Sequence, residues 1–174
     1  MGCLPVRAAS FTRQANMSQL PKIVKYKIQL VRESEFPYTL TSKEPHKSLL
    51  SPQEAYELIE KTLNLSLEPK ENFGILALDV KVRAIGLHII SVGSIDGSIA
   101  TPRDVFMAAI LNNAAAIILF HNHPSGDPTP SSEDIKVTRN LCDAGNIMGI
   151  QVLDHIIIGE NRYESLKQSG YILF

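Results

Sequence analysis

The sequence predicts a mixed α/β (α+β) domain, in which a central sheet is flanked by helices. Strand patterns and helix patterns follow one another along the chain and do not separate into blocks. A strand hairpin is predicted by ENFGILALDV (71–80) and RAIGLHIISVG (83–93), which a short charged turn joins. AAIILFHN (115–122) and GIQVLDHIIIG (149–159) show little polar alternation, which is typical of strands buried on both faces.

Three helices are predicted by their capping residues. The first two begin with an N-cap hydroxyl followed by proline, at Ser51–Pro52 and Thr101–Pro102. Glu54 and Asp104 lie three residues after these caps, where an acidic side chain completes a capping box or favours the helix start. The third helix is expected from Ser131 to about Asn146, with the sequence GN as its end.

The N-terminal part of the chain is predicted to differ from the rest. Residues 1–21 are polar and patternless, so a disordered tail is expected there, and 22–174 are expected to form one domain. KIVKYKIQLV (22–31) has the pattern of a strand, and the motif-bearing core begins at about residue 50. With 174 residues, of which 44% are hydrophobic, such a domain needs no disulfide or structural metal to remain folded.

Composition argues against several classes of function. A net charge of −1 makes DNA binding doubtful, because nucleic-acid binders usually carry a strongly basic surface. The lysines of KIVKYK are better explained as the solvated face of an edge strand. No apolar run approaches the length of a membrane span. Cys3 and Cys142 form no CxxC motif, which is typical of a reducing compartment and favours a cytoplasmic location.

The segment HNHPSGDPTPSSED (121–134) carries the strongest chemical pattern. His121 and His123 are two residues apart at the end of a strand, so both side chains point to one side. Ser131 begins a helix, and Asp134 lies in its first turn. A proline-rich loop can fold this helix start back over the strand end. Two imidazoles and one carboxylate form the protein ligand set of a catalytic zinc, whose fourth position stays open for water.

Hydrolysis at such a zinc also needs a general base. His123 and Asp134 would be occupied as ligands, so the base is expected from another strand. Residue types alone leave three candidates, Glu68, Glu71 and Asp79.

The spacing H-x-H, seven residues, S-x-x-D resembles the JAMM (JAB1/MPN-type) zinc metalloprotease motif at every position. Together with LDHIIIG and TPRDVFMAAILNNAAAIILF, it resembles the RadC-like family from about Leu50 to the C-terminus. The resemblance implies a JAB/MPN-like fold with a layered architecture like that of cytidine deaminases. It also implies one Zn²⁺ held by His121, His123 and Asp134, and an oxyanion-stabilising role for Ser131. The family's catalytic glutamate precedes an apolar strand, and Glu71 is the residue at that position.

Members of this family are often labelled as DNA-repair proteins, and fuller members carry a helix-hairpin-helix module before the metal domain. Residues 1–50 show no hairpin signature of that module, so the chain resembles the short, stand-alone members. This difference weakens a DNA-repair interpretation.

Other polar residues near these strands have a functional and a structural interpretation. Asp154 and His155 in LDHIIIG could orient a ligand histidine, or could pack and cap the sheet. His88 is expected to be a strand histidine with a satisfied hydrogen bond. Asn122 is expected to point away from the two histidines and to fix the backbone of a turn. Gly93–Gly97 is predicted to form a turn at the sheet rim, where a substrate could pass.

Two functional hypotheses follow. The first is a zinc-dependent hydrolase that cuts an amide or isopeptide bond in a peptide or protein substrate. The second is a non-catalytic JAMM-fold binding module, associated with DNA repair or DNA metabolism. The complete ligand set favours the hydrolase, because a decayed site would usually lose one ligand. A nuclease is less favoured, because a basic surface and the carboxylates for a second metal are both missing. The sequence indicates no membrane partner and does not define an oligomeric state.

Overall fold

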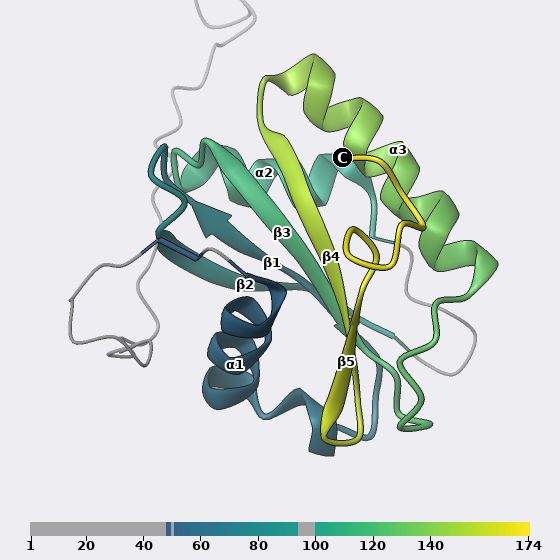
Figure 1. Cartoon of the computed structure of the whole chain (residues 1–174). Coiled ribbons are helices and arrows are strands. Elements are labelled where there is room, and N and C mark those ends of the chain that lie inside the picture. Colours follow the sequence, from purple (N-terminus) through teal and green to yellow (C-terminus); the bar gives the residue numbers. More distant parts are fainter. Residues whose placement is uncertain (1–47, 50, 94–99) are drawn as a thin grey trace, which may run out of the picture.

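A computed structural model describes residues 48–49, 51–93 and 100–174. Within this part, five strands form one mixed sheet in the order β2-β1-β3-β4-β5 (Figure 1). Strand β3 pairs antiparallel with β1 and parallel with β4, and the outer pairs are antiparallel. The elements, in chain order, are α1 (Pro52–Leu63), the 3₁₀ turn η2 (Leu65–Leu67), β1 (Asn72–Leu78), β2 (Ala84–Val92), α2 (Pro102–Leu111), β3 (Ala116–Asn122), α3 (Ser132–Met148), β4 (Gln151–Gly159) and β5 (Arg162–Ser165).

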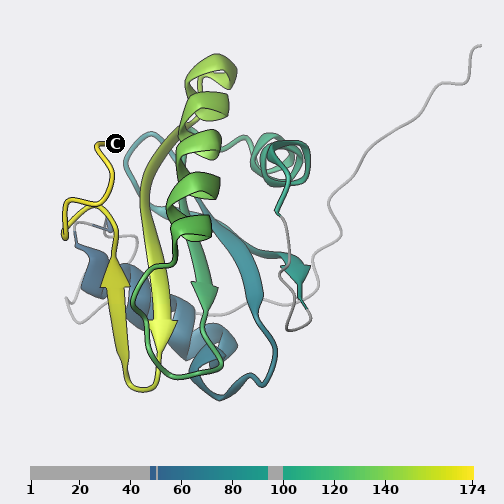
Figure 2. The same cartoon turned by 90° about the vertical axis from the view of Figure 1, so that its right-hand side faces the viewer.

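Helices cover both faces of the sheet (Figures 1 and 2). One core packs α1 against alternate residues of the inner strands, including Leu76, Phe120 and Ile156. A second core packs α2 and α3 against the intervening residues on the other face, including Ile75 and Leu119. Every residue of β1 and β3 is therefore buried, which explains the lack of polar alternation in their sequences.

The predicted mixed α/β architecture is confirmed, and the capping predictions hold in detail. The hydroxyl of Ser51 accepts from the backbone N–H of Glu54, and Thr101 accepts from that of Asp104. A proline follows each cap at the helix start. The sequence predicts these helix starts correctly because an N-cap involves only residues within one helical turn.

The predicted end of the third helix at about Asn146 is wrong. Helix α3 continues to Met148, and Gly149, with a φ of 68°, is its left-handed cap. Gly145 lies inside the helix, where a Cβ atom would come within 2.6 Å of the Ile150 carbonyl oxygen. The glycine is required by the close approach of strand β4, so it does not mark a helix end.

Other predictions concern residues outside the described part. The tail 1–21, the strand 22–31 and most of the turn after Gly93 belong to this group. None of the helices in the described ranges is long and apolar enough to span a membrane.

Candidate metal centre

Strand β3 places His121 on the face of the sheet that α2 and α3 cover, and His123 directly follows the last residue of the strand. His121 and His123 follow Ile117 and Leu119 at alternate positions, so all four side chains share this face. His121 is almost fully buried, with 1% of its surface exposed, while His123 lies at the partly open rim. The rigid, buried strand fixes both rings to one side, as the sequence predicted.

Helix α3 brings a carboxylate to the same place. Ser131 caps the helix, its hydroxyl accepts from the Asp134 backbone N–H, and Asp134 returns a bond by accepting from the Ser131 backbone N–H. The Ser131 hydroxyl also donates to Asp134 Oδ2 at 2.7 Å. Asp134 therefore completes the capping box and faces the histidines at the same time, so its two possible roles do not exclude each other.

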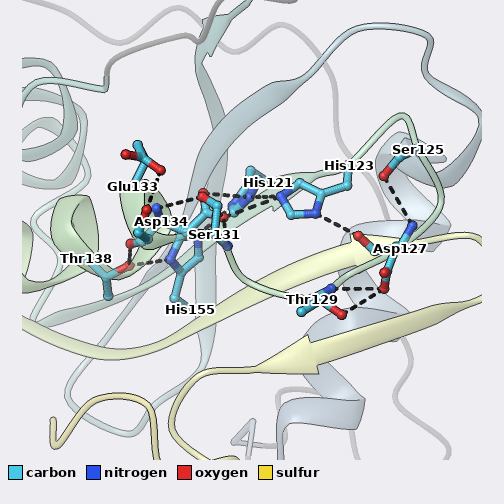
Figure 3. A network of polar contacts seen from close by, with 11 residues as sticks. His121, His123, Ser125, Asp127, Thr129, Ser131, Glu133, Asp134, Thr138 and His155 are labelled. Atoms are coloured by element: carbon cyan, nitrogen blue, oxygen red, sulfur yellow. Dashed lines mark hydrogen bonds and ion pairs between the residues drawn. The ribbon is translucent and has the colours of Figure 1, made fainter.

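The three side chains converge at one point (Figure 3). The Nε2 atoms of His121 and His123 are 2.9 Å apart. The carboxylate of Asp134 lies 3.2 Å from Nε2 of His121 and 3.5 Å from Nε2 of His123. One ligand atom from each residue lies within 4.8 Å of the others, in the only such group among the described residues.

The remaining ring nitrogen of His123 identifies its tautomer. Nδ1 lies 2.7 Å from the Asp127 carbonyl oxygen, which can only accept, so Nδ1 carries a proton. In neutral His123, the lone pair on Nε2 then points at His121 and Asp134. A carboxylate and a lone pair at this distance favour a cation between them. The donor set of two imidazoles and one carboxylate fits Zn²⁺ with an open fourth position.

The electrostatics of the site agree with a cation-binding role. Burial alone would raise the pKa of Asp134, but the imidazoles of His121 and His123 outweigh it, with help from the Ser131 hydroxyl, and hold that pKa far below its usual range. The hydrogen bond with Asp134 raises the pKa of His123, against the effect of burial. Asp134 is therefore ionised and available as a ligand.

Of the three candidate bases, Glu71 is the one whose charge acts on His123. β1 and β3 pair Phe73 with His121, and continuing this antiparallel register places Glu71 opposite His123. Glu71 is half-buried, and its negative charge contributes to raising the pKa of His123. Asp79 follows the other end of β1, about 25 Å along the strand, where it binds Arg83.

Asn122 fixes the segment that carries Glu71, as predicted for a side chain on the opposite face. Its Oδ1 accepts from the Asn72 backbone N–H at 2.8 Å, and its Nδ2 donates to the carbonyls of Lys70 and Glu68. The backbone on either side of Glu71 is therefore tied to the strand that carries the histidines.

Asp154 and His155 have different roles. His155 Nε2 lies 2.8 Å from Nδ1 of His121, so it contacts a candidate ligand directly. Asp154 binds the C-terminal segment, because it accepts from the Ser165 hydroxyl and the Lys167 backbone N–H. Burial raises the pKa of Asp154 and lowers that of His155.

Two groups at the site were missed by sequence reasoning. These are Thr138, whose hydroxyl contacts His155, and the carbonyl of Asp127. The i,i+4 spacing from Asp134 to Thr138 along α3 was the signal that could have identified Thr138. A backbone carbonyl has no sequence signal. His88 contacts Asn112 Nδ2, which confirms that it is a satisfied strand histidine.

The fold and these side chains define a JAB-type α/β domain with a candidate metal centre at the end of its central strand. Residues 49–171 match the model of the RadC-like JAB domain, and the chain belongs to this family.

Curated relatives agree with this assignment. A UPF0758 protein of Caldanaerobacter subterraneus is 52% identical over 128 residues, which cover 73% of this chain and 54% of the relative. A UPF0758 protein of Desulfitobacterium hafniense is 52% identical over 122 residues, covering 70% and 53%. One from Methanococcoides burtonii is 42% identical over 169 residues, covering 91% and 71%. The chain thus spans about half the length of the first two.

Proposed function

We propose that the protein is a zinc-dependent hydrolase that cleaves an amide or isopeptide bond in a peptide or protein. The convergence of His121, His123 and Asp134 at hydrogen-bonding distance carries this proposal. A zinc ion bound there would polarise a carbonyl and lower the pKa of a bound water to about 7. Membership of the JAB family supports the same chemistry, since its JAMM motif is that of zinc metalloproteases.

The chain's own residues would supply the proton transfers and the electrostatic stabilisation. Glu71 would accept a proton from the attacking water and donate it to the leaving amine. The Ser131 hydroxyl would donate a hydrogen bond to the oxyanion. In the structure this hydroxyl donates to Asp134, so it would exchange one acceptor for another during the reaction. His123, at the partly open rim, would leave one side of the site accessible to substrate.

Metal analysis of the purified protein tests the site. About one equivalent of Zn²⁺ is expected, and His121→Ala should lose it. His88→Ala is the matched control, because His88 lies on the edge strand β2 and contacts Asn112. Equal zinc content in His121→Ala and the wild type would refute the assignment.

A peptide-library cleavage screen, with and without a chelator, tests the activity. Cleavage should stop when zinc is removed and return when it is restored. Glu71→Gln should retain zinc and lose cleavage, while Glu68→Gln should retain both. A fully active Glu71→Gln variant would show that the base is another residue. A zinc-loaded protein that cleaves no peptide or isopeptide would contradict the proposed reaction and favour a binding module.

A further inference from the structure

A chain of buried polar groups lies behind His121 and connects it to helix α3 (Figure 3). The Thr138 hydroxyl donates to the Asp134 backbone carbonyl at 2.5 Å. Thr138 Oγ1 also lies 2.6 Å from His155 Nδ1, and His155 Nε2 lies 2.8 Å from His121 Nδ1. All three side chains are buried, with exposed fractions of 0% for Thr138 and His155 and 1% for His121.

The direction of each hydrogen bond follows from the bond between the Thr138 hydroxyl and the Asp134 carbonyl. A carbonyl oxygen can only accept, so the single hydroxyl proton of Thr138 is used on the Asp134 carbonyl. Thr138 Oγ1 must then accept from His155, which places the His155 proton on Nδ1. Neutral His155 therefore presents an unprotonated Nε2 to His121.

His121 must consequently donate through Nδ1, and in neutral His121 the other ring nitrogen, Nε2, then carries a lone pair. This is the nitrogen that faces His123 and Asp134. In a metal-bound histidine, the hydrogen-bond partner of the ring nitrogen that does not bind the metal is usually a carboxylate, a carbonyl or water. Here it is a neutral imidazole, which contacts the Phe73 ring edge-on, with centroids 5.6 Å apart.

We infer that Thr138 and His155 are positioning residues, which hold His121 in the tautomer that a metal ligand requires. We call the hydrogen-bonded series Asp134 carbonyl, Thr138, His155 and His121 the relay. Asp134 takes part twice, because its carboxylate faces the candidate metal centre and its backbone carbonyl accepts from Thr138. The relay thus joins α3, β4 and β3 behind the site. The inference rests on the proposed metal site and extends it to two residues that do not touch the metal.

Zinc affinity measured by competition with a chelator tests the relay. Thr138→Val preserves the shape of the side chain and removes the hydroxyl. His155 is then free to adopt the other tautomer, which would donate to His121 and move the His121 proton to Nε2. Thr138→Val should weaken zinc binding by about 10–100-fold, the usual effect of losing an outer-shell partner. Thr138→Ser restores the hydroxyl and should bind zinc nearly as tightly as the wild type.

The tautomer itself can be read in the metal-free protein by ¹⁵N NMR of the histidine rings. Wild type and Thr138→Ser should show the proton of His121 on Nδ1, and Thr138→Val should lose this preference. His155→Gln supplies a second test, because its amide oxygen can still accept from His121, whereas His155→Leu cannot. The glutamine variant should bind zinc more tightly than the leucine variant.

The outcomes separate the relay from the site. If His121→Ala loses zinc while Thr138→Val keeps both the wild-type affinity and the wild-type tautomer, the relay is refuted and the site stands. Equal zinc affinities for His155→Gln and His155→Leu would also refute the relay. If His121→Ala keeps its zinc, the site assignment itself fails.

Discussion

Replacing Asn122 by alanine should destabilise the domain strongly, although this side chain lies on the opposite face from the two candidate ligand histidines. Asn122 is 1% exposed and ends the central strand β3. Its amide holds the first residue of β1, Asn72, and the backbone before it at Lys70 and Glu68, with bond lengths of 2.8, 3.0 and 3.3 Å. The substitution removes all three contacts at once.

The magnitude follows from these contacts. Each hydrogen bond contributes about 1 kcal/mol net, so three bonds contribute about 3 kcal/mol. The Asn72 backbone N–H belongs to a residue that is only 8% exposed, so it would be left buried without its acceptor. This desolvated donor brings the expected loss to about 3–4 kcal/mol in the free energy of unfolding.

Urea denaturation followed by circular dichroism measures this loss. With an m-value of about 2 kcal/mol/M, the midpoint should fall by about 1.5–2 M. Asn140→Ala is the matched control, since Asn140 is exposed on α3 and its replacement should change stability by less than about 0.5 kcal/mol. A midpoint for Asn122→Ala within about 0.3 M of that of the control would refute the reasoning.

Substitutions at two further positions test the packing and the capping of α3. Gly145→Ala should lower the melting temperature in calorimetry, because a contact of 2.6 Å with the Ile150 carbonyl forces an overpacking cost of about 1–3 kcal/mol, which exceeds the gain in helix propensity of about 1 kcal/mol. A higher melting temperature would contradict this packing. Ser131→Ala should reduce stability by about 1 kcal/mol through loss of the α3 cap, whereas Ser131→Asn should keep the cap. In the proposed reaction both variants should lose cleavage, and full cleavage by Ser131→Asn would exclude a catalytic role for the hydroxyl.

Much of the candidate site could be predicted from the sequence because its three candidate ligands lie within fourteen residues. The alternation of β3 puts His121 and His123 on one face, and the N-cap pattern at Ser131 locates Asp134 in the first turn of α3. Strand alternation and helix capping both depend on the backbone geometry of a few neighbouring residues, and the local sequence specifies that geometry. The same locality explains why the starts of α1 and α2 were predicted correctly.

The end of α3 could not be predicted in this way. Glycine often marks the end of a helix, but Gly145 instead allows the backbone at Ile150, just before β4, to lie close to α3. Whether a glycine ends the helix or allows close packing depends on where β4 lies, and the sequence of α3 does not indicate the position of β4.

The chain by itself determined the mixed α/β class and the group of residues suited to bind a metal. Only the tertiary structure separated Glu71 from Asp79 in space, because the register of β1 against β3 places one near His123 and the other at the far end of the strand. It also separated Asp154 from His155 and brought Thr138 into the hydrogen-bond relay. Strand pairing and helix packing join residues that are distant in sequence, and these contacts fix which nitrogen of His121 carries the proton.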